Sequence, residues 1–194
     1  MNWLKDEFVN FYKITRRFEF EVETLSPPET SFKDEKPCSE CNSPCEDEVV
    51  FKIKHETPIQ KLAWDKFFQQ FSGMKFCDGK KCCDLLLFED GRKIVFCEMT
   101  CSQQKYIESK SAKARKQLQD SSSVLLNVDK IKERIKAFSK VCIFAVRKNS
   151  IGKNNDALKR MNAMIPVFTK NPTSALLGNG FELITVTYPT TYTW

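Results

Sequence analysis

Two carboxylates stand in a segment that otherwise has the pattern of a buried hairpin. Residues 82–101, CCDLLLFEDGRKIVFCEMTC, form two apolar runs joined at Asp90-Gly91, with Asp84 at the head of the first run and Glu98 near the end of the second. Buried strands rarely contain carboxylates, because an ion that leaves water loses its hydration. Two carboxylates on one face of a hairpin could share a metal ion, so their relative position decides what chemistry is open to them.

The length of the connecting loop decides whether these two acids meet. A two-residue loop sends Asp84 and Glu98 to opposite faces, because side chains alternate along a strand. A three-residue loop over residues 89–91, with Gly91 left-handed in a G1 bulge, makes Glu98 the diagonal neighbour of Asp84 on the same face. Diagonal neighbours lie about 7–8 Å apart, close enough for a shared ion. In the alternative interpretation, Asp84 caps a turn and Glu98 pairs with a lysine.

The segments CDLLLF, KIVFCEMT and AKARKQL resemble the PD-(D/E)xK, or restriction-endonuclease-like, superfamily. In that pattern an acid starts one strand, a second strand ends in Glu-x-x, and a helix rich in Lys and Gln follows. The similar part covers roughly residues 76–146. The resemblance implies that Asp84 and Glu98 hold Mg²⁺ or Mn²⁺, which suits hard carboxylate oxygens. It also implies metal-dependent hydrolysis of phosphodiester bonds, in a setting of bacterial anti-phage defence.

The chain departs from this pattern at Thr100, where the superfamily has a lysine two residues after the Glu. A threonine cannot supply positive charge near the attacking water. Three alternatives follow: Lys105 or Lys110 supplies the charge from the next helix, Gln103 or Gln104 orients the water, or the protein is a catalytically inactive pseudonuclease that binds nucleic acid or a partner protein. The candidate catalytic residues are Asp84, Glu98, Gln103 and Lys105.

Basic residues concentrate in the segment 105–116, KYIESKSAKARK, which contains five Lys or Arg residues and one acidic residue. We expect a helix over residues 105–119 that turns Ile107, Ala114 and Leu118 toward the sheet, because these residues are spaced by seven and four. The lysines then face solvent, either as a phosphate-binding surface or as an ordinary solvated helix face. The candidate nucleic-acid-binding residues are Lys105, Lys110, Lys113 and Lys116. The net charge of +6 is compatible with DNA or RNA as a partner.

The nine cysteines do not indicate a disulfide framework, because their number is odd and we expect the protein in the cytoplasm. The segment CSECNSPC places three thiols at the spacing of a partial metal knuckle. The candidate ligands are Cys38, Cys41 and Cys45, with Cys77 as the fourth and Cys82 or Cys83 as its alternatives. Zn²⁺ is the default for four thiolates, and an iron–sulfur cluster is the alternative that the resemblance adds. An unliganded loop is the simpler interpretation.

The order of apolar patterns predicts an α/β fold with a mixed central sheet and helices on both faces. We expect a restriction-endonuclease-like domain over residues 58–194 and an N-terminal extension, residues 1–57, that carries strands and the cysteine-rich loop. The expected helices cover residues 2–12, 58–71, 105–119, 129–139 and 155–165. The expected strands cover residues 17–25, 49–54, 141–146 and 181–188 and the two arms of the hairpin. The Pro-rich residues 26–37 are expected to form a loop, and His55 to lie at the surface.

The sequence favours a protein that does not enter a membrane. No apolar run approaches the roughly 18 residues of a membrane span. Lys5, Asp6 and Glu7 interrupt any signal-peptide core, so the expected location is the cytoplasm. Besides DNA or RNA, a protein partner or a homodimer is possible, and a zinc-stabilised interaction module with incidental acids is a third, separate hypothesis.

Overall fold

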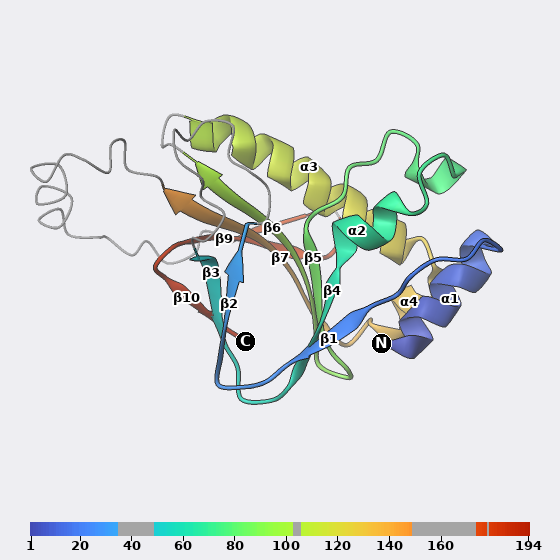
Figure 1. The fold of residues 1–194 in the computed structure, drawn as a ribbon, viewed down its shortest axis with the longest axis horizontal. Helices are drawn as coiled ribbons and strands as arrows, with labels where there is room; N and C mark the ends of the chain where they lie inside the picture. The colour runs from blue at the N-terminus through green and yellow to red at the C-terminus, as the bar shows by residue number, and fades with distance from the viewer. Residues whose placement is uncertain (35–48, 103–105, 149–173, 178) are drawn as a thin grey trace, which may run out of the picture.

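The computed structural model describes residues 1–34, 49–102, 106–148, 174–177 and 179–194. In this part the chain is an α/β protein with three layers: a layer of helices, a seven-stranded mixed sheet and a three-stranded sheet (Figure 1). The helices are α1 (Asn2–Tyr12), α2 (Trp64–Gln69), α3 (Ile107–Leu126) and α4 (Asp129–Arg134), and a 3₁₀ turn, η1 (Lys75–Cys77), follows α2.

The large sheet has the strand order β1-β4-β5-β6-β7-β9-β8. Its strands are β1 (Val22–Leu25), β4 (Ile59–Ala63), β5 (Leu85–Glu89), β6 (Lys93–Ser102), β7 (Ser139–Lys148), β8 (Ser174–Leu176) and β9 (Glu182–Thr187). Strands β4, β5 and β6 form an antiparallel meander, whereas β7 is parallel to β6. A parallel neighbour needs a crossover connection, and α3 and α4 supply it here.

The small sheet has the order β10-β3-β2, with strands β2 (Glu29–Lys33), β3 (Val49–Lys54) and β10 (Thr191–Thr193). It packs on the large sheet through a shared apolar core that includes Phe51 and Ile53. The indole N–H of Trp194 donates to Glu89 Oε2 at 2.6 Å, so the last described residue reaches the turn of the central hairpin. The small sheet therefore occupies the face of the large sheet that we expected helices to cover.

The central hairpin is buried on both faces, which explains its continuous apolar runs. Leu86 and Phe96 belong to the core on the helix side, whereas Leu87 and Val95 belong to the core between the two sheets. This alternation follows the two-residue period of a strand. Within the described residues the helices pack on one face only, so the expectation of helices on both faces is wrong there.

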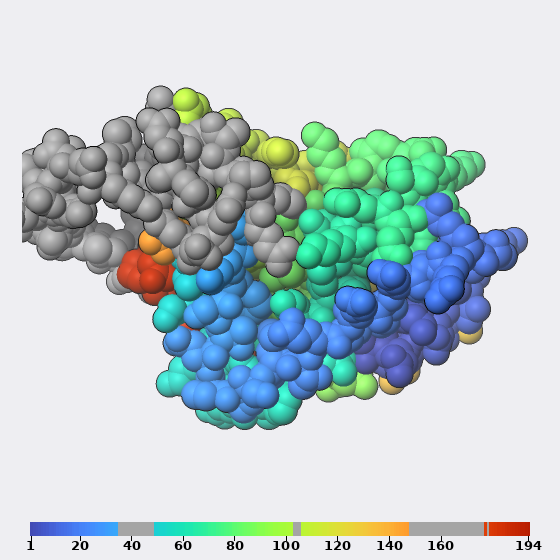
Figure 2. Space-filling view, viewed as in Figure 1, coloured from blue at the N-terminus to red at the C-terminus, as the bar shows by residue number. Residues whose placement is uncertain are grey.

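The N-terminal helix is part of the main core. Phe8 is fully buried and its ring contacts the rings of Trp64 and Phe67 at centroid distances of 6.2 and 5.5 Å. In Figure 2, the blue N-terminal residues lie against the teal and green residues of α2 and η1. The described part of residues 1–57 thus shares both cores with the rest of the chain, while the expected division at residue 57 stays a prediction.

Two expected elements are corrected by the structure. Residues 58–71 do not form one helix, because residues 59–63 form β4 and only Trp64–Gln69 is helical. Ile59 and Leu62 have helical spacing, but they face different cores. A strand that is buried on both sides can therefore have the same apolar spacing as a helix. Residues 26–37, expected as a loop, contain β2.

Smaller differences concern element ends and one side chain. The basic helix runs on to Leu126, and the next helix ends at Arg134. His55 is buried, contrary to expectation, and its ring nitrogens contact Thr30 Oγ1 at 3.0 Å and the carbonyl of Thr57 at 2.8 Å. The helix expected over residues 155–165 lies outside the described residues. No helix in the described part of the chain is long and apolar enough to cross a membrane.

Candidate active site

The turn of the central hairpin has the odd length that the metal hypothesis requires. Glu89 pairs with Lys93, so the loop comprises residues 90–92. Gly91 has a φ of 74°, in the left-handed region that glycine enters without steric cost. The loop therefore has three residues, as one alternative predicted, but it lies one position later than residues 89–91.

This register, extended by one residue, relates the position of Asp84 to that of Glu98. Leu85 pairs with Cys97 at the start of β5, so continuing the register by one residue, into the bend at Asp84, would set Asp84 directly opposite Glu98, where a diagonal relation was expected. Directly opposite residues have Cβ atoms about 4.5–5.5 Å apart. Asp84 is buried just before β5, and its Oδ2 accepts the N–H of Met99 at 2.7 Å. That bond draws the carboxylate toward the residue that follows Glu98.

Two buried thiols respond to the charges of both acids. The pKa values of Cys83 and Cys97 are raised well above the ordinary value, first because burial disfavours a thiolate and further because Asp84 and Glu98 are negative. For Cys83, a hydrogen bond with Ser121 acts in the opposite direction. Both raised pKa values disfavour the thiolate, which is the nucleophilic form of a cysteine.

The segment leading into Asp84 is fastened to α3 by side chains that we call the α3 anchor: Gln117, Asp120 and Ser121. Asp120 Oδ2 accepts the N–H of Lys81 at 3.1 Å, Gln117 Nε2 donates to the carbonyl of Cys82 at 2.9 Å, and Ser121 Oγ accepts the N–H of Cys83 at 2.9 Å. All three anchor side chains are buried, and buried polar groups are kept mainly where they hydrogen-bond. The anchor holds the backbone up to the residue before Asp84.

A second support holds Asp84 from the other side. Its carbonyl accepts the N–H groups of Trp64 at 2.8 Å and Asp65 at 3.3 Å, at the start of α2. Asp84 is thus fixed by α2 and by Met99, and the α3 anchor holds the residues before it, so its position depends on three separate elements.

Sequence reasoning missed the α3 anchor. The run QDSSS, residues 119–123, starts where the expected helix ended and was given no role. Its signal was the run of Asp and Ser, which compete with the helix backbone for hydrogen bonds and are disfavoured in helix interiors. Such a run inside a helix is a reason to look for a partner segment that needs those groups.

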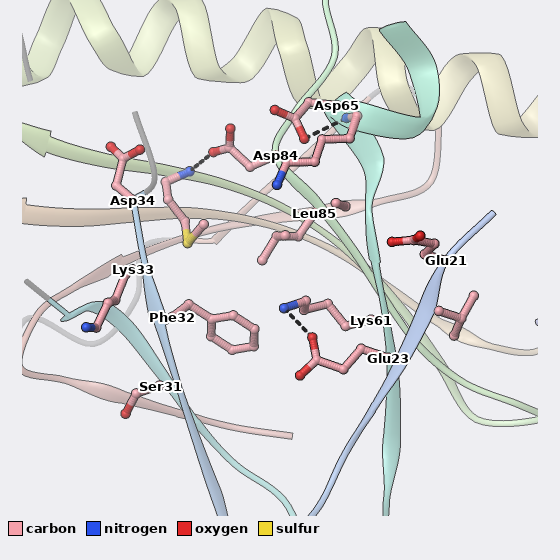
Figure 3. Close-up of a pocket in the computed structure, with 14 residues that line it drawn as sticks. Glu21, Glu23, Ser31, Phe32, Lys33, Asp34, Lys61, Asp65, Asp84 and Leu85 are labelled. Carbon is pink, nitrogen blue, oxygen red and sulfur yellow. Dashed lines mark hydrogen bonds and ion pairs between the residues drawn. The ribbon is translucent and has the colours of Figure 1, made fainter. Parts of the chain in front are cut away.

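Asp84 also lines a pocket of about 580 Å³ between the two sheets. In Figure 3, Asp84 and Asp65 lie at one end, and the ion pair of Lys61 with Glu23, 2.6 Å long, lies at the other. The charged lining residues are Glu21, Glu23, Asp34, Asp65, Asp84, Lys33, Lys61 and Lys66. Lys66 is a cation that sequence reasoning did not consider, because it precedes the segment that carries the resemblance.

Glu98 does not line this pocket. It follows Phe96 by two residues on β6, and Phe96 belongs to the helix-side core. Glu98 is half-buried, and its Oε2 is shielded from solvent. Asp84 therefore reaches the pocket between the sheets, whereas Glu98 lies on β6 in line with a residue of the helix-side core.

The other candidates of the nuclease hypothesis are only partly described. Gln103, Gln104 and Lys105 lie outside the described residues. Thr100 is only 9% exposed and lies in β6, so it takes part in the sheet. On α3, Ala114 and Leu118 are buried and Ile107 is half-buried, as the spacing predicted.

The candidate phosphate-binding lysines on α3 differ in their surroundings. Lys113 and Lys116 are exposed and Lys110 is half-buried. Lys116 is not simply solvated, because its Nζ lies 2.8 Å from Asp120 Oδ1. One of the predicted basic residues is therefore attached to the α3 anchor.

The proposed metal knuckle falls largely on undescribed residues. Cys38, Cys41 and Cys45 lie outside the described part of the chain, so the knuckle stays a prediction. Cys77, its expected fourth ligand, is half-buried in η1 against the helix-side core. Burial raises the pKa of this thiol to about 11, although Arg16 acts in the opposite direction. A metal would have to displace this proton before the thiolate could bind.

The described residues hold no cluster of three His, Cys, Asp or Glu side chains arranged for a metal ion. A pair of carboxylates still fits Mg²⁺, which usually keeps several waters and binds through one or two carboxylates together with substrate phosphates. Comparison of the chain with protein-family models, curated proteins and solved structures finds no match. Function therefore has to be argued from the site itself.

Proposed function

We propose that the protein is a metal-dependent nuclease that hydrolyses phosphodiester bonds in DNA or RNA, with Asp84 and Glu98 as the ligands of Mg²⁺ or Mn²⁺. The observation that carries this proposal is the register of β5 and β6, which, continued by one residue beyond the start of β5, would bring Asp84 opposite Glu98. When bound, the ion would make a water more acidic and offset negative charge on the phosphate.

The secondary structure supports the resemblance on which the proposal rests. Asp84 stands at the start of a strand, Glu98 lies in the next strand, and the basic helix follows. A restriction-endonuclease-like fold remains part of the proposal. So does the expected context of anti-phage defence, for which the resemblance is the only support.

The chain's own residues would contribute position and charge. The Met99 N–H fixes the Asp84 carboxylate, and the α3 anchor fixes the residues before it, so little reorganisation is needed when an ion binds. The positive charge that Thr100 cannot supply would come from Lys66 in the pocket, or from Lys105 or Lys110. Gln103 is the candidate for orienting water.

A catalytically inactive nucleic-acid-binding protein is the second candidate. Thr100 favours it, because this buried residue in β6 occupies the position of the motif's lysine. Both candidate functions use the basic surface of α3, so nucleic-acid binding alone does not distinguish them. Measurements of metal affinity and of cleavage do distinguish them.

The test compares Asp84→Asn and Glu98→Gln with Asp90→Asn, a matched change at an exposed acid of the same hairpin. Manganese binding is followed by electron paramagnetic resonance of free Mn²⁺, and cleavage with plasmid DNA and structured RNA in Mg²⁺, Mn²⁺ or EDTA. We expect the first two variants to lose both activities and Asp90→Asn to keep them.

Other outcomes of this test select among the hypotheses. Nucleic-acid binding without cleavage, unchanged by Asp84→Asn, would establish the pseudonuclease. Wild-type protein that binds neither manganese nor nucleic acid would leave the protein-interaction module as the better account.

A further inference from the structure

Two basic segments that are far apart in the sequence meet at one buried carboxylate. Lys116 Nζ lies 2.8 Å from Asp120 Oδ1, and Lys80 Nζ lies 3.7 Å from the same oxygen. The Asp120 side chain is 5% exposed, whereas those of Lys116 and Lys80 are 59% and 35% exposed. The two ammonium groups therefore lie close together at the surface, with one negative charge beneath them.

Positive charge is in excess around this point. Residues 78–81 and 113–120 contain two acids, Asp78 and Asp120, and five cations. The cations are Lys80, Lys81, Lys113, Arg115 and Lys116. One buried carboxylate cannot neutralise the two lysines that share it, so a further anion would be attracted to them.

The same carboxylate connects this surface to the candidate active site. While Asp120 Oδ1 receives the two lysines, its Oδ2 accepts the N–H of Lys81, three residues before Asp84. Figure 1 shows the last part of the segment between α2 and β5 running beside α3. An anion held here would therefore lie beside the segment that leads into Asp84.

We propose that Lys80 and Lys116 form a cluster that binds backbone phosphates of nucleic acid, with Asp120 as the buried carboxylate that holds the two lysines in place. This rests on the proposed function and deepens it, because it names a surface, beside the segment that leads into Asp84, that would hold the substrate. Ammonium groups bind phosphate as point charges, without reading the base sequence. The cluster therefore contributes affinity and position.

The test measures binding without metal or cleavage. Fluorescence anisotropy of a labelled single-stranded oligonucleotide and of its duplex is recorded in EDTA over a range of NaCl concentrations. Lys80→Ala, Lys116→Ala and the double variant are compared with Lys132→Ala, a matched change at an exposed lysine of α4. For each lost contact, the slope of log K against log salt should flatten by about 0.9 for the duplex and about 0.7 for the single strand. Lys132→Ala should leave it unchanged.

Asp120→Asn provides a test of opposite sign. The amide keeps the shape but removes the negative charge that competes with phosphate for both lysines. We expect tighter binding at low salt, whereas the lysine variants bind more weakly. A purely structural role for the Lys–Asp contacts would weaken binding in all of these variants alike.

The outcomes separate this inference from the proposed function. If Lys80→Ala and Lys116→Ala match Lys132→Ala, the cluster is not the phosphate surface, and manganese binding at Asp84 still decides the nuclease proposal. If the wild type shows no salt-dependent binding to either oligonucleotide, the inference is wrong. If Asp120→Asn does not fold, the lysine variants alone decide.

Discussion

Ser121→Ala should loosen the segment that leads into Asp84, and Ser123→Ala should not. Ser121 Oγ accepts the buried N–H of Cys83 at 2.9 Å, whereas Ser123, on the same helix, is only half-buried. Both changes replace serine by alanine in the interior of α3. Differences between the two variants therefore report the hydrogen bond and the burial of the hydroxyl group.

The expected magnitude follows from two opposing effects. A buried N–H left without its acceptor costs about 1–3 kcal/mol in the free energy of unfolding. Alanine favours the helix more than serine does, by about 0.5 kcal/mol. Ser123→Ala should thus be neutral or slightly stabilising. The difference between the variants, in which the helix effect cancels, should be about 1–3 kcal/mol in favour of Ser123→Ala.

Urea denaturation followed by circular dichroism measures the global effect, and amide hydrogen exchange measures the local one. We expect faster exchange at residues 81–85 in Ser121→Ala and weaker manganese binding, because Asp84 loses part of its support. Equal unfolding midpoints and equal exchange in the two variants would show that the α3 anchor does not position Asp84.

Two further predictions concern the core and the alkaline range. Phe8→Ala should lower the free energy of unfolding by about 3–5 kcal/mol, whereas Phe11→Ala, at a residue 47% exposed on the same helix, should have little effect in urea denaturation. The Cys77 thiol ionises near its ordinary value of 9.0 when unfolded but, because of burial, has a pKa of about 11 when folded. The unfolded state therefore binds fewer protons between these values, so stability should fall as pH rises through this range. Cys77→Ala should make that fall shallower in urea midpoints measured from pH 8 to 10.5, and an equally steep fall would contradict the assignment.

The sequence predicted the parts of the fold that depend on local periodicity. Residues 2–12 form a helix and residues 49–54 a strand within the predicted bounds. The prediction of secondary structure failed where one segment contributes residues to both cores. A strand such as β4, with Ile59 facing the inter-sheet core and Leu62 the helix-side core, loses the alternation that identifies a half-buried strand. The partner strand of β3 was missed because residues 26–37 are Pro-rich and polar.

The position of the hairpin loop could not be chosen from the residues around it. Both two-residue and three-residue turns suit the sequence EDGR, and they place Asp84 and Glu98 differently. In the structure the strand end at Glu89 is held from far away in the chain: its carboxylate accepts Thr57 Oγ1 at 2.7 Å and the Trp194 indole N–H at 2.6 Å. Those partners are remote in sequence, so the register is a tertiary property.

The candidate active site is likewise a tertiary property, which explains why its two acids were visible in the sequence and its supports were not. A carboxylate in an apolar run is conspicuous by itself, and the alternation rule limits where it can point. The groups that hold Asp84 in place come from α2, α3 and β6, and each of them looks ordinary in its own segment. Preorganisation of this kind depends on hydrogen bonds between different helices and strands. A search for local sequence motifs therefore finds the two acids but not the buried Asp120 and Ser121. In this chain, those two side chains join α3 to the segment that leads into Asp84.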